Sequence, residues 1–160
     1  MKALTGRLKK YGLELNLEKT KVVSFNKYGK TEQGMFDFLG FTLYTRKSRK
    51  GVPMIAVMTS KKRFDAKLQR VKLWCQENRH KTKLKPLWQA FIAKLRGHIE
   101  YYGVSLNCDK VNDFVFHATR TFFKWINRRS QRKSITWDKF NIFMKAFPPP
   151  RVYIKHSLFE

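Results

Sequence analysis

Apolar side chains recur every three or four positions between residues 84 and 102, and this stripe constrains the fold more than any other feature. Such spacing puts them on one face of an α-helix, which other elements must cover. Gly97 within the stripe costs about 1 kcal/mol relative to alanine, which indicates close packing or a contact there. We therefore expect a packed helix over 84–102. Its apolar face comprises Leu84, Leu87, Trp88, Phe91, Ile92, Leu95, Ile99 and Tyr102.

Neighbouring segments carry the same spacing and can supply that cover. After Thr59 and Ser60, either of which can cap a helix, apolar residues follow at Phe64, Leu68, Val71 and Cys75. Another helix is expected over about 110–129, with Phe114, Ala118, Phe122, Trp125 and Ile126 facing inward. An apolar tail over 135–144 is followed by three prolines at 148–150, which end any helix. The apolar spacing over residues 59–160 therefore predicts a helical bundle.

The first 58 residues have a different, mainly extended pattern. A helix end over 3–11 is stopped by Gly12 as a carboxy-terminal cap. Leucines then alternate with polar residues over 13–17, and apolar runs at 21–25, 36–44 and 52–58 are typical of short strands. The turn-like stretch 46–51 joins the last two as a β-hairpin. The predicted class is α+β, with a strand segment over 1–58 and a helical unit over 59–160.

The formal net charge of +24, from 35 basic and 11 acidic residues, indicates a polyanionic partner. Nucleic acid is the first candidate and an anionic membrane surface the second. The excess is +8 over residues 1–58, +14 over 59–133 and +2 over 134–160. Because the basic residues are interleaved with the apolar pattern, we expect them on a folded surface.

Several other classes of protein are disfavoured. Cys75 and Cys108 are isolated, so free thiols of a cytoplasmic protein are favoured over a disulfide. The four histidines never pair with them at metal-ligand spacing, which argues against zinc. There is no signal peptide and no apolar run near 18 residues, so we expect neither secretion nor membrane insertion.

Catalytic patterns are absent from the sequence. Polymerases and nucleases hold divalent metals with paired carboxylates, and no such pair occurs. Asp109 and Asp113 lie one helical turn apart, which predicts an N-cap and a first-turn acid of the third helix rather than a metal site. Asp37 is a lone carboxylate in the apolar stretch FDFLGF. No nucleophile elbow or glycine-rich phosphate loop occurs, so we expect no catalytic residue and no cofactor in this chain.

Candidate nucleic-acid contacts are plentiful. Arg120, Lys124 and Arg128 recur every fourth residue opposite the apolar face, where they can replace counterions along a phosphate backbone. Arg129, Arg132 and Lys133 extend this row past the helix end. Three cations at a helix start, Lys61, Lys62 and Arg63, oppose the helix dipole, which favours a phosphate contact over simple solvation.

The stretch LRGHIEYYG, residues 95–103, adds aromatic side chains to the charge. Arg96 and His98 are candidate RNA contacts within it. Tyrosine rings can stack on unpaired bases or fill a core. Tyr102 belongs to the apolar stripe and is expected in the core, which leaves Tyr101 as the better candidate for a base contact.

Three ordered motifs resemble the group II intron reverse transcriptases, or intron maturases: YGLELNLEKTKVVSF (11–25), FDFLGF (36–41) and LRGHIEYY (95–102). The match covers nearly the whole chain. The resemblance implies an end of the palm with a primer-grip element at Phe38, Leu39, Gly40 and Phe41, then a thumb and maturase domain. It also implies binding of structured intron RNA, assistance to splicing and clasping of a template–primer duplex.

The chain departs from that family where the chemistry lies. The Tyr-Ala-Asp-Asp box and the second metal-binding aspartate are missing, so Mg²⁺ would be held only with a complementary fingers and palm polypeptide. By the same analogy Lys19 could act as a general acid in such a complex, but a solvated or RNA-contacting lysine is preferred. The leading hypothesis is a noncatalytic RNA-binding module, cytoplasmic or organellar. Its rivals are a subunit of a split reverse transcriptase and a repurposed adaptor for protein assembly.

Overall fold

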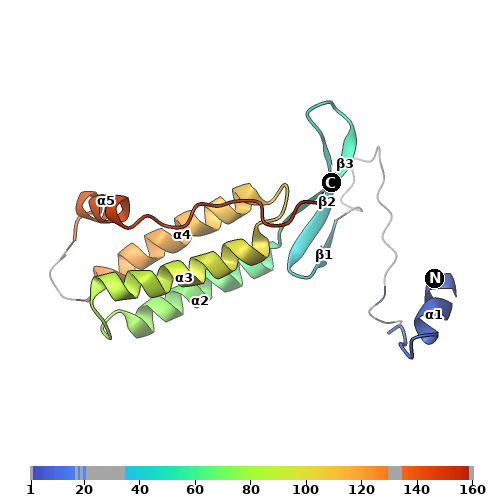
Figure 1. Cartoon of the computed structure of the whole chain (residues 1–160), viewed down its shortest axis with the longest axis horizontal. Coiled ribbons are helices and arrows are strands. Elements are labelled where there is room, and N and C mark those ends of the chain that lie inside the picture. Colours follow the sequence, from blue (N-terminus) through green and yellow to red (C-terminus); the bar gives the residue numbers. More distant parts are fainter. Residues whose placement is uncertain (1, 17, 19, 21–34, 130–134, 159–160) are drawn as a thin grey trace.

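The computed structural model describes residues 2–16, 18, 20, 35–129 and 135–158. Its fold is α+β, as predicted, with a three-stranded antiparallel sheet followed by helices (Figure 1). Helix α1 (Lys2–Lys9) comes first, and the sheet order is β1 (Phe36–Phe38), β2 (Phe41–Lys47), β3 (Pro53–Thr59). The later helices are α2 (Lys61–Asn78), α3 (Leu84–Tyr102), α4 (Cys108–Ile126) and α5 (Trp137–Ala146).

Helix α1 ends at the predicted glycine. Gly12 has a φ of +69°, and the amides of Gly12 and Leu13 donate to the carbonyls of Lys9 and Leu8, both at 3.1 Å. This is a Schellman cap. The strand predicted over 13–17 is wrong where the structure describes it, since residues 13–16 are not in a strand. An alternating pattern needs a neighbouring strand to pair with, and the described sheet ends at β1. The strand predicted over 21–25 lies outside the described residues.

The hairpin of β2 and β3 is confirmed, with Phe41 opposite Thr59 and Lys47 opposite Pro53. The single strand predicted over 36–44 is wrong, because FDFLGF turns within itself. Leu39 and Gly40 have φ values of +49° and +85° and form a two-residue turn between Phe38 and Phe41. Positive φ at both positions is the turn type that matches the twist of a tight hairpin. The stretch is therefore two strands and a turn.

The core is aromatic and joins α3, α4 and α5. The ring of Trp88 is fully buried and lies 5.4 Å from Phe91, 5.1 Å from Phe122 and 5.7 Å from Phe140, between ring centroids. Its indole N–H donates to the carbonyl of Phe147 at 2.8 Å. The segment after α5 then runs back along the bundle towards the sheet (Figure 1). The stripe predicted over 84–102 therefore forms one side of this core.

A buried asparagine joins the sheet to the bundle. Asn107 is fully buried just before α4, and its amide oxygen accepts from the backbone N–H of Thr59 at 2.7 Å. Its amide nitrogen donates to the Thr59 hydroxyl at 2.9 Å and to the Tyr102 carbonyl at 2.8 Å. Asn107 is also the N-cap residue of α4, so the N-cap predicted at Asp109 is wrong and Asp109 lies in the first turn. One side chain thus connects the ends of β3 and α3 to the start of α4.

The carboxy-terminal segment is fixed against the α3–α4 connection. The amides of Lys155 and His156 donate to the Gly103 carbonyl at 2.6 and 3.0 Å, and Ser105 donates to the His156 carbonyl at 3.1 Å. A Cβ atom on Gly103 would meet the carbonyl oxygens of Ile99 at 2.5 Å and Tyr153 at 2.6 Å. Gly103 therefore permits a close approach of three backbone segments. By contrast, a Cβ on Gly97 would meet nothing within 4 Å, so the close packing predicted at Gly97 is not present.

Candidate nucleic-acid interface

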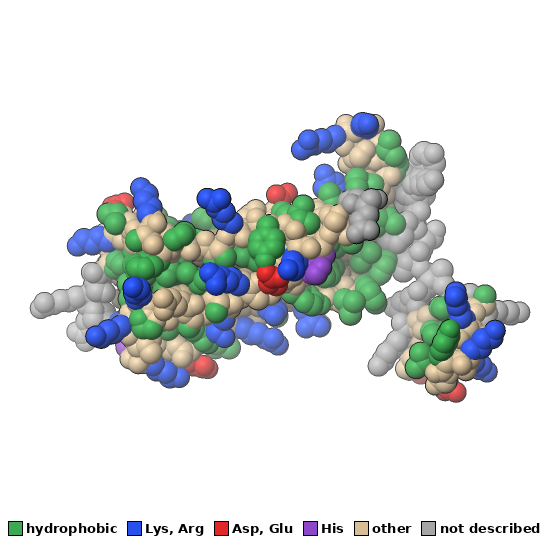
Figure 2. All heavy atoms as spheres, in the orientation of Figure 1, with side chains coloured by type: hydrophobic (Ala, Val, Ile, Leu, Met, Phe, Trp, Pro, Cys, Tyr) green, Lys and Arg blue, Asp and Glu red, His purple; other side chains and the backbone are tan. Residues whose placement is uncertain are grey.

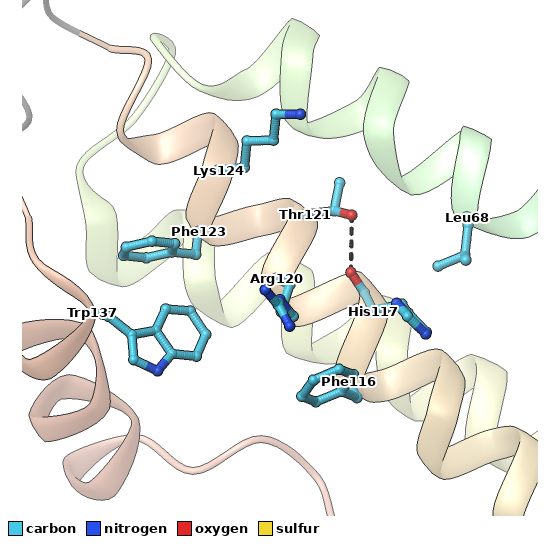
Figure 3. A pocket seen from close by; sticks show the side chains of 8 residues that line it. All are labelled: Leu68, Phe116, His117, Arg120, Thr121, Phe123, Lys124 and Trp137. Carbon is cyan, nitrogen blue, oxygen red and sulfur yellow. Dashed lines mark hydrogen bonds between the residues drawn. The ribbon is translucent and has the colours of Figure 1, made fainter.

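The outer face of α4 carries the predicted row of cations. Arg120, Lys124 and Arg128 are exposed, whereas Phe122 and Trp125 of the same helix are buried against α3 and α5. Figure 3 shows Arg120 and Lys124 as neighbouring side chains of α4. Arg120 and Lys124 are four residues apart and so share one face of α4. Arg128 lies past the helix end at Ile126, with its guanidinium 4.9 Å from the centre of the Trp125 ring.

Aromatic side chains accompany this row. The Arg120 guanidinium lies 5.4 Å from the centre of the exposed Phe116 ring, a cation–π contact. Trp137 of α5 packs edge-on against Phe123, with ring centroids 4.6 Å apart. Together these groups border a shallow hollow of about 790 Å³ (Figure 3). The hollow is lined by Leu68, Phe116, His117, Arg120, Thr121, Phe123, Lys124 and Trp137, none of them acidic.

The cations are little neutralised within the chain. In the described ranges two ion pairs form, Lys110 with Asp113 and Lys155 with Glu100, each at 3.4 Å. Neither involves a cation of the α4 row. Figure 2 shows lysine and arginine side chains spread over the helical body, with few acidic side chains on the side of the molecule that faces the viewer. The charge is therefore available to an external anion.

The start of α2 forms a second basic feature. Lys61, Lys62 and Arg63 are exposed in its first turn, which contains no acidic residue. Ser60 is the N-cap residue, but its side chain makes no capping hydrogen bond. The positive end of the helix dipole therefore adds to the three side-chain charges, which favours a bound anion.

The two tyrosines of α3 divide as predicted. Tyr102 is buried, which confirms it as a core residue, and Tyr101 is 52% exposed. The Tyr101 hydroxyl donates to the Leu39 carbonyl at 2.9 Å, so it also holds α3 to the β1–β2 turn. Arg96 is exposed on the same helix.

His98 does not lie on the surface where a direct RNA contact was expected. Its side chain is 6% exposed and stacks on Phe114, with ring centroids 3.6 Å apart. Burial, with a smaller contribution from the Lys67 charge, lowers the pKa of His98 to about 4. His98 is therefore neutral at pH 7. The spacing alone puts His98 on the apolar face, three residues after Leu95 and four before Tyr102, and only its polar side chain favoured a surface position.

The remaining predicted contacts are placed as follows. Arg129 is half-buried, and its Nε and one terminal nitrogen have no hydrogen-bond partner among the described residues. Desolvation lowers the pKa of the Arg129 guanidinium. Lys19, Arg132 and Lys133 lie outside the described residues.

Three of the primer-grip-like residues, Phe38, Leu39 and Phe41, border an apolar hollow on the sheet, and Gly40 does not. Phe38 is 61% and Leu39 68% exposed, while Gly40 and Phe41 are half-buried. The hollow measures about 700 Å³ and is also lined by Leu43 and Val57. Asp37, the acid of this stretch, accepts a hydrogen bond at 2.5 Å from Thr42, which faces it across the hairpin. The hydrogen bond between Thr42 and Asp37 thus links β2 to β1.

Sequence reasoning missed the aromatic residues of the α4 surface, Phe116 and Trp137. A signal was present, since Phe116 precedes Arg120 by four residues and so belongs to the same helical row. It also missed Lys67, Arg70 and Trp74 of α2, which continue the row begun by Arg63. The α4 row and the α2 row line separate hollows.

No arrangement for metal chemistry is seen in the described ranges, where no three or more His, Cys, Asp and Glu side chains gather. Cys75 is buried and Cys108 partly buried, both as free thiols, and burial raises the pKa of Cys75 to about 12. None of the described helices combines the length and apolarity needed to cross a membrane. No family model, curated protein or solved structure matches the chain.

Proposed function

We propose that this chain is an RNA-binding module of the group II intron reverse transcriptase and maturase type, without a polymerase active site of its own. It would bind structured intron RNA, assist splicing and clasp a template–primer duplex. The proposal rests on the motif resemblance and, above all, on one structural observation. The outer face of α4 combines cations at every fourth residue with exposed aromatic rings around a hollow without acidic lining.

This combination suits RNA better than it suits a membrane surface. Lysine and arginine neutralise phosphates without reading sequence, and exposed rings accept unstacked bases. An interfacial membrane helix would instead present a broad apolar face to lipid. The apolar face of α4 is already buried in the core, since Phe114, Phe122 and Trp125 pack there. RNA with loops and bulges therefore fits the α4 surface better than lipid headgroups do.

The test is a salt titration of RNA affinity with charge-matched variants. Each phosphate that the chain neutralises contributes about 0.7–0.9 to the slope of log K against log salt concentration. Arg120→Gln with Lys124→Gln should lower the slope by about that amount for each phosphate that is no longer neutralised. The control is Arg49→Gln with Lys50→Gln, which removes the same charge from the exposed β2–β3 turn. Affinity that barely changes with salt, or equal effects in both double variants, would refute the α4 interface.

A protein partner is the second candidate, as a complementary fingers and palm polypeptide or another assembly partner. The observation that favours it is the exposure of Phe38 and Leu39 beside the apolar hollow on the sheet. With a complementary palm, Mg²⁺-dependent primer extension should return when the two chains are mixed. Phe38→Ser with Leu39→Ser should abolish that association in nuclease-treated protein and leave salt-dependent RNA affinity intact. Association that survives this double substitution would remove the hollow as the docking site.

A further inference from the structure

A second basic hollow lies between α2 and α3, separate from the α4 surface. It measures about 340 Å³, near the lower end of the range of about 300–1,000 Å³ for small-molecule sites. An adjoining hollow of about 310 Å³ shares Lys67, Arg70, Tyr101 and Tyr102 with it, so the two form one groove. The groove reaches from Trp74 to the Leu39–Gly40 turn.

The chemistry of the groove has two parts. Arg63, Lys67, Arg70 and Lys94 line it, and no acidic residue does. The Lys94 ammonium lies 5.2 Å from the centre of the Trp74 ring, and the Tyr101 ring is more than half exposed. Cations beside aromatic faces are the usual elements of sites for single-stranded nucleic acid, in which phosphates meet the charge and bases stack.

His98 supplies the specific feature of this groove. It is one of the lining residues, and neither of its ring nitrogens has a hydrogen-bond partner among the described residues. A buried polar group without a partner costs about 1–3 kcal/mol, so such groups call for an explanation. A neutral imidazole offers one donor and one acceptor, and the polar edge of a nucleobase offers both as well. Both ring nitrogens are buried in the unbound chain, so binding of a base requires side chains that line the groove to move.

Gly97 points to the same conclusion independently. It lies inside α3, where glycine costs about 1 kcal/mol relative to alanine. A Cβ atom there would meet nothing within 4 Å, so packing does not require the glycine. Gly97 lines both this groove and the apolar hollow on the sheet, and its missing side chain leaves open space at the wall of the groove.

From these observations we infer that the α2–α3 groove is a binding site for one unpaired nucleotide of an RNA, with its base directed at His98. Its phosphates lie against Lys67, Arg70 and Lys94, and Trp74 or Tyr101 provides a stacking face. This inference rests on the proposed RNA-binding function and adds a second, separate site to it. It predicts that the chain prefers RNA with a bulged nucleotide to a fully paired helix of the same length.

The test uses two RNA hairpins that differ by a single bulged 2-aminopurine, with affinity measured by anisotropy and base stacking by emission. The wild-type chain should bind the bulged hairpin about five-fold tighter or more, as expected for one stacked base, with quenched emission. Gly97→Leu fills the groove, and His98→Phe keeps the ring stack but removes both nitrogens. Both variants should lose the preference and keep their affinity for the paired hairpin.

The control is Gly6→Leu, because Gly6 also lies in a helix with open space at its Cβ position but far from the groove in sequence. It should keep the preference. Circular dichroism checks that each variant folds. If Gly97→Leu does not fold, His98→Phe alone tests the site. Equal wild-type affinity for the two hairpins, or a preference that persists in both groove variants, overturns the nucleotide site alone. Binding of neither hairpin overturns the proposed RNA-binding function and this inference together.

Discussion

Acidification from pH 7 to pH 5 should destabilise this fold through His98. In the unfolded chain the imidazole has its usual pKa of 6.5, whereas in the folded chain burial lowers the pKa to about 4. Between these values the unfolded state binds more protons than the folded state. Stability therefore falls as the pH drops through 6.5, and the loss is complete below about pH 4.

The magnitude follows from that difference in pKa. At 1.36 kcal/mol per pH unit, a difference of about 2.5 units gives a full loss of about 3 kcal/mol. About 2 kcal/mol of it should be lost between pH 7 and pH 5. For a domain with a typical stability of about 5–15 kcal/mol, a loss of that size is readily measured.

The groups that face His98 do not mask this effect. The Lys67 charge on α2 acts in the same direction, while Phe114 and Tyr102 remain neutral in acid. The carboxyl pKa of Glu100 is lowered from 4.5, chiefly by a hydrogen bond from Tyr153, so Glu100 titrates below the window between pH 5 and pH 7.

The assay is urea unfolding followed by tryptophan fluorescence at pH 7 and pH 5 and constant ionic strength. His98→Phe is the comparison, because phenylalanine can keep the stack on Phe114 and does not titrate. The wild type should lose about 2 kcal/mol over this range, and the variant should lose little. An equal loss in both proteins would refute the argument, since the protonation would then lie elsewhere.

Four further substitutions test the packing by the same unfolding assay. Gly97→Ala should stabilise the fold by about 1 kcal/mol, because the position is helical and open. Gly103→Ala should destabilise the fold, because the added Cβ would meet two carbonyl oxygens within 2.6 Å. If both substitutions changed stability in the same direction, this account of the two glycines would be wrong. Asn107→Ala should cost about 2–4 kcal/mol, because it strands buried groups of Thr59 and Tyr102, and a loss under 1 kcal/mol would show that water replaces the amide. Trp88→Phe should cost about 1–3 kcal/mol through the unpaired Phe147 carbonyl and the smaller ring volume, and an unchanged midpoint would argue against that hydrogen bond.

The helices could be predicted from sequence because their apolar periodicity is long. Helix α3, of 19 residues, begins and ends at the same residues as the apolar stripe. Helix α5 ends two residues before the first proline. The strands were harder. The sequence FDFLGF resembles one apolar strand because leucine, at position 39, is not a residue type that favours turns. The turn is recognised only from the positive φ values of Leu39 and Gly40.

The residues of the candidate sites could likewise be predicted where they share one helix, and could not where they come from distant segments. Exposed cations at fixed helical spacing, such as Arg120 and Lys124, were placed correctly on a surface because periodicity alone orients them. Trp74 of α2 meets Lys94 and His98 of α3 only through the packing of α2 beside α3, and Trp137 approaches Phe123 only through the return of α5. Such contacts between distant segments leave no spacing rule in the sequence.

The position of α2 has a consequence for the kind of RNA that fits. Leu68 lines the hollow beside α4, whereas its neighbour Lys67 lines the groove beside α3. The two candidate surfaces therefore lie on different sides of one helix. A straight duplex laid along α4 would reach the first surface and leave the cations of the second unpaired. RNA that engages both has to bend around α2 and present an unpaired nucleotide, which a folded RNA with bulges and loops can do at lower cost than a regular helix.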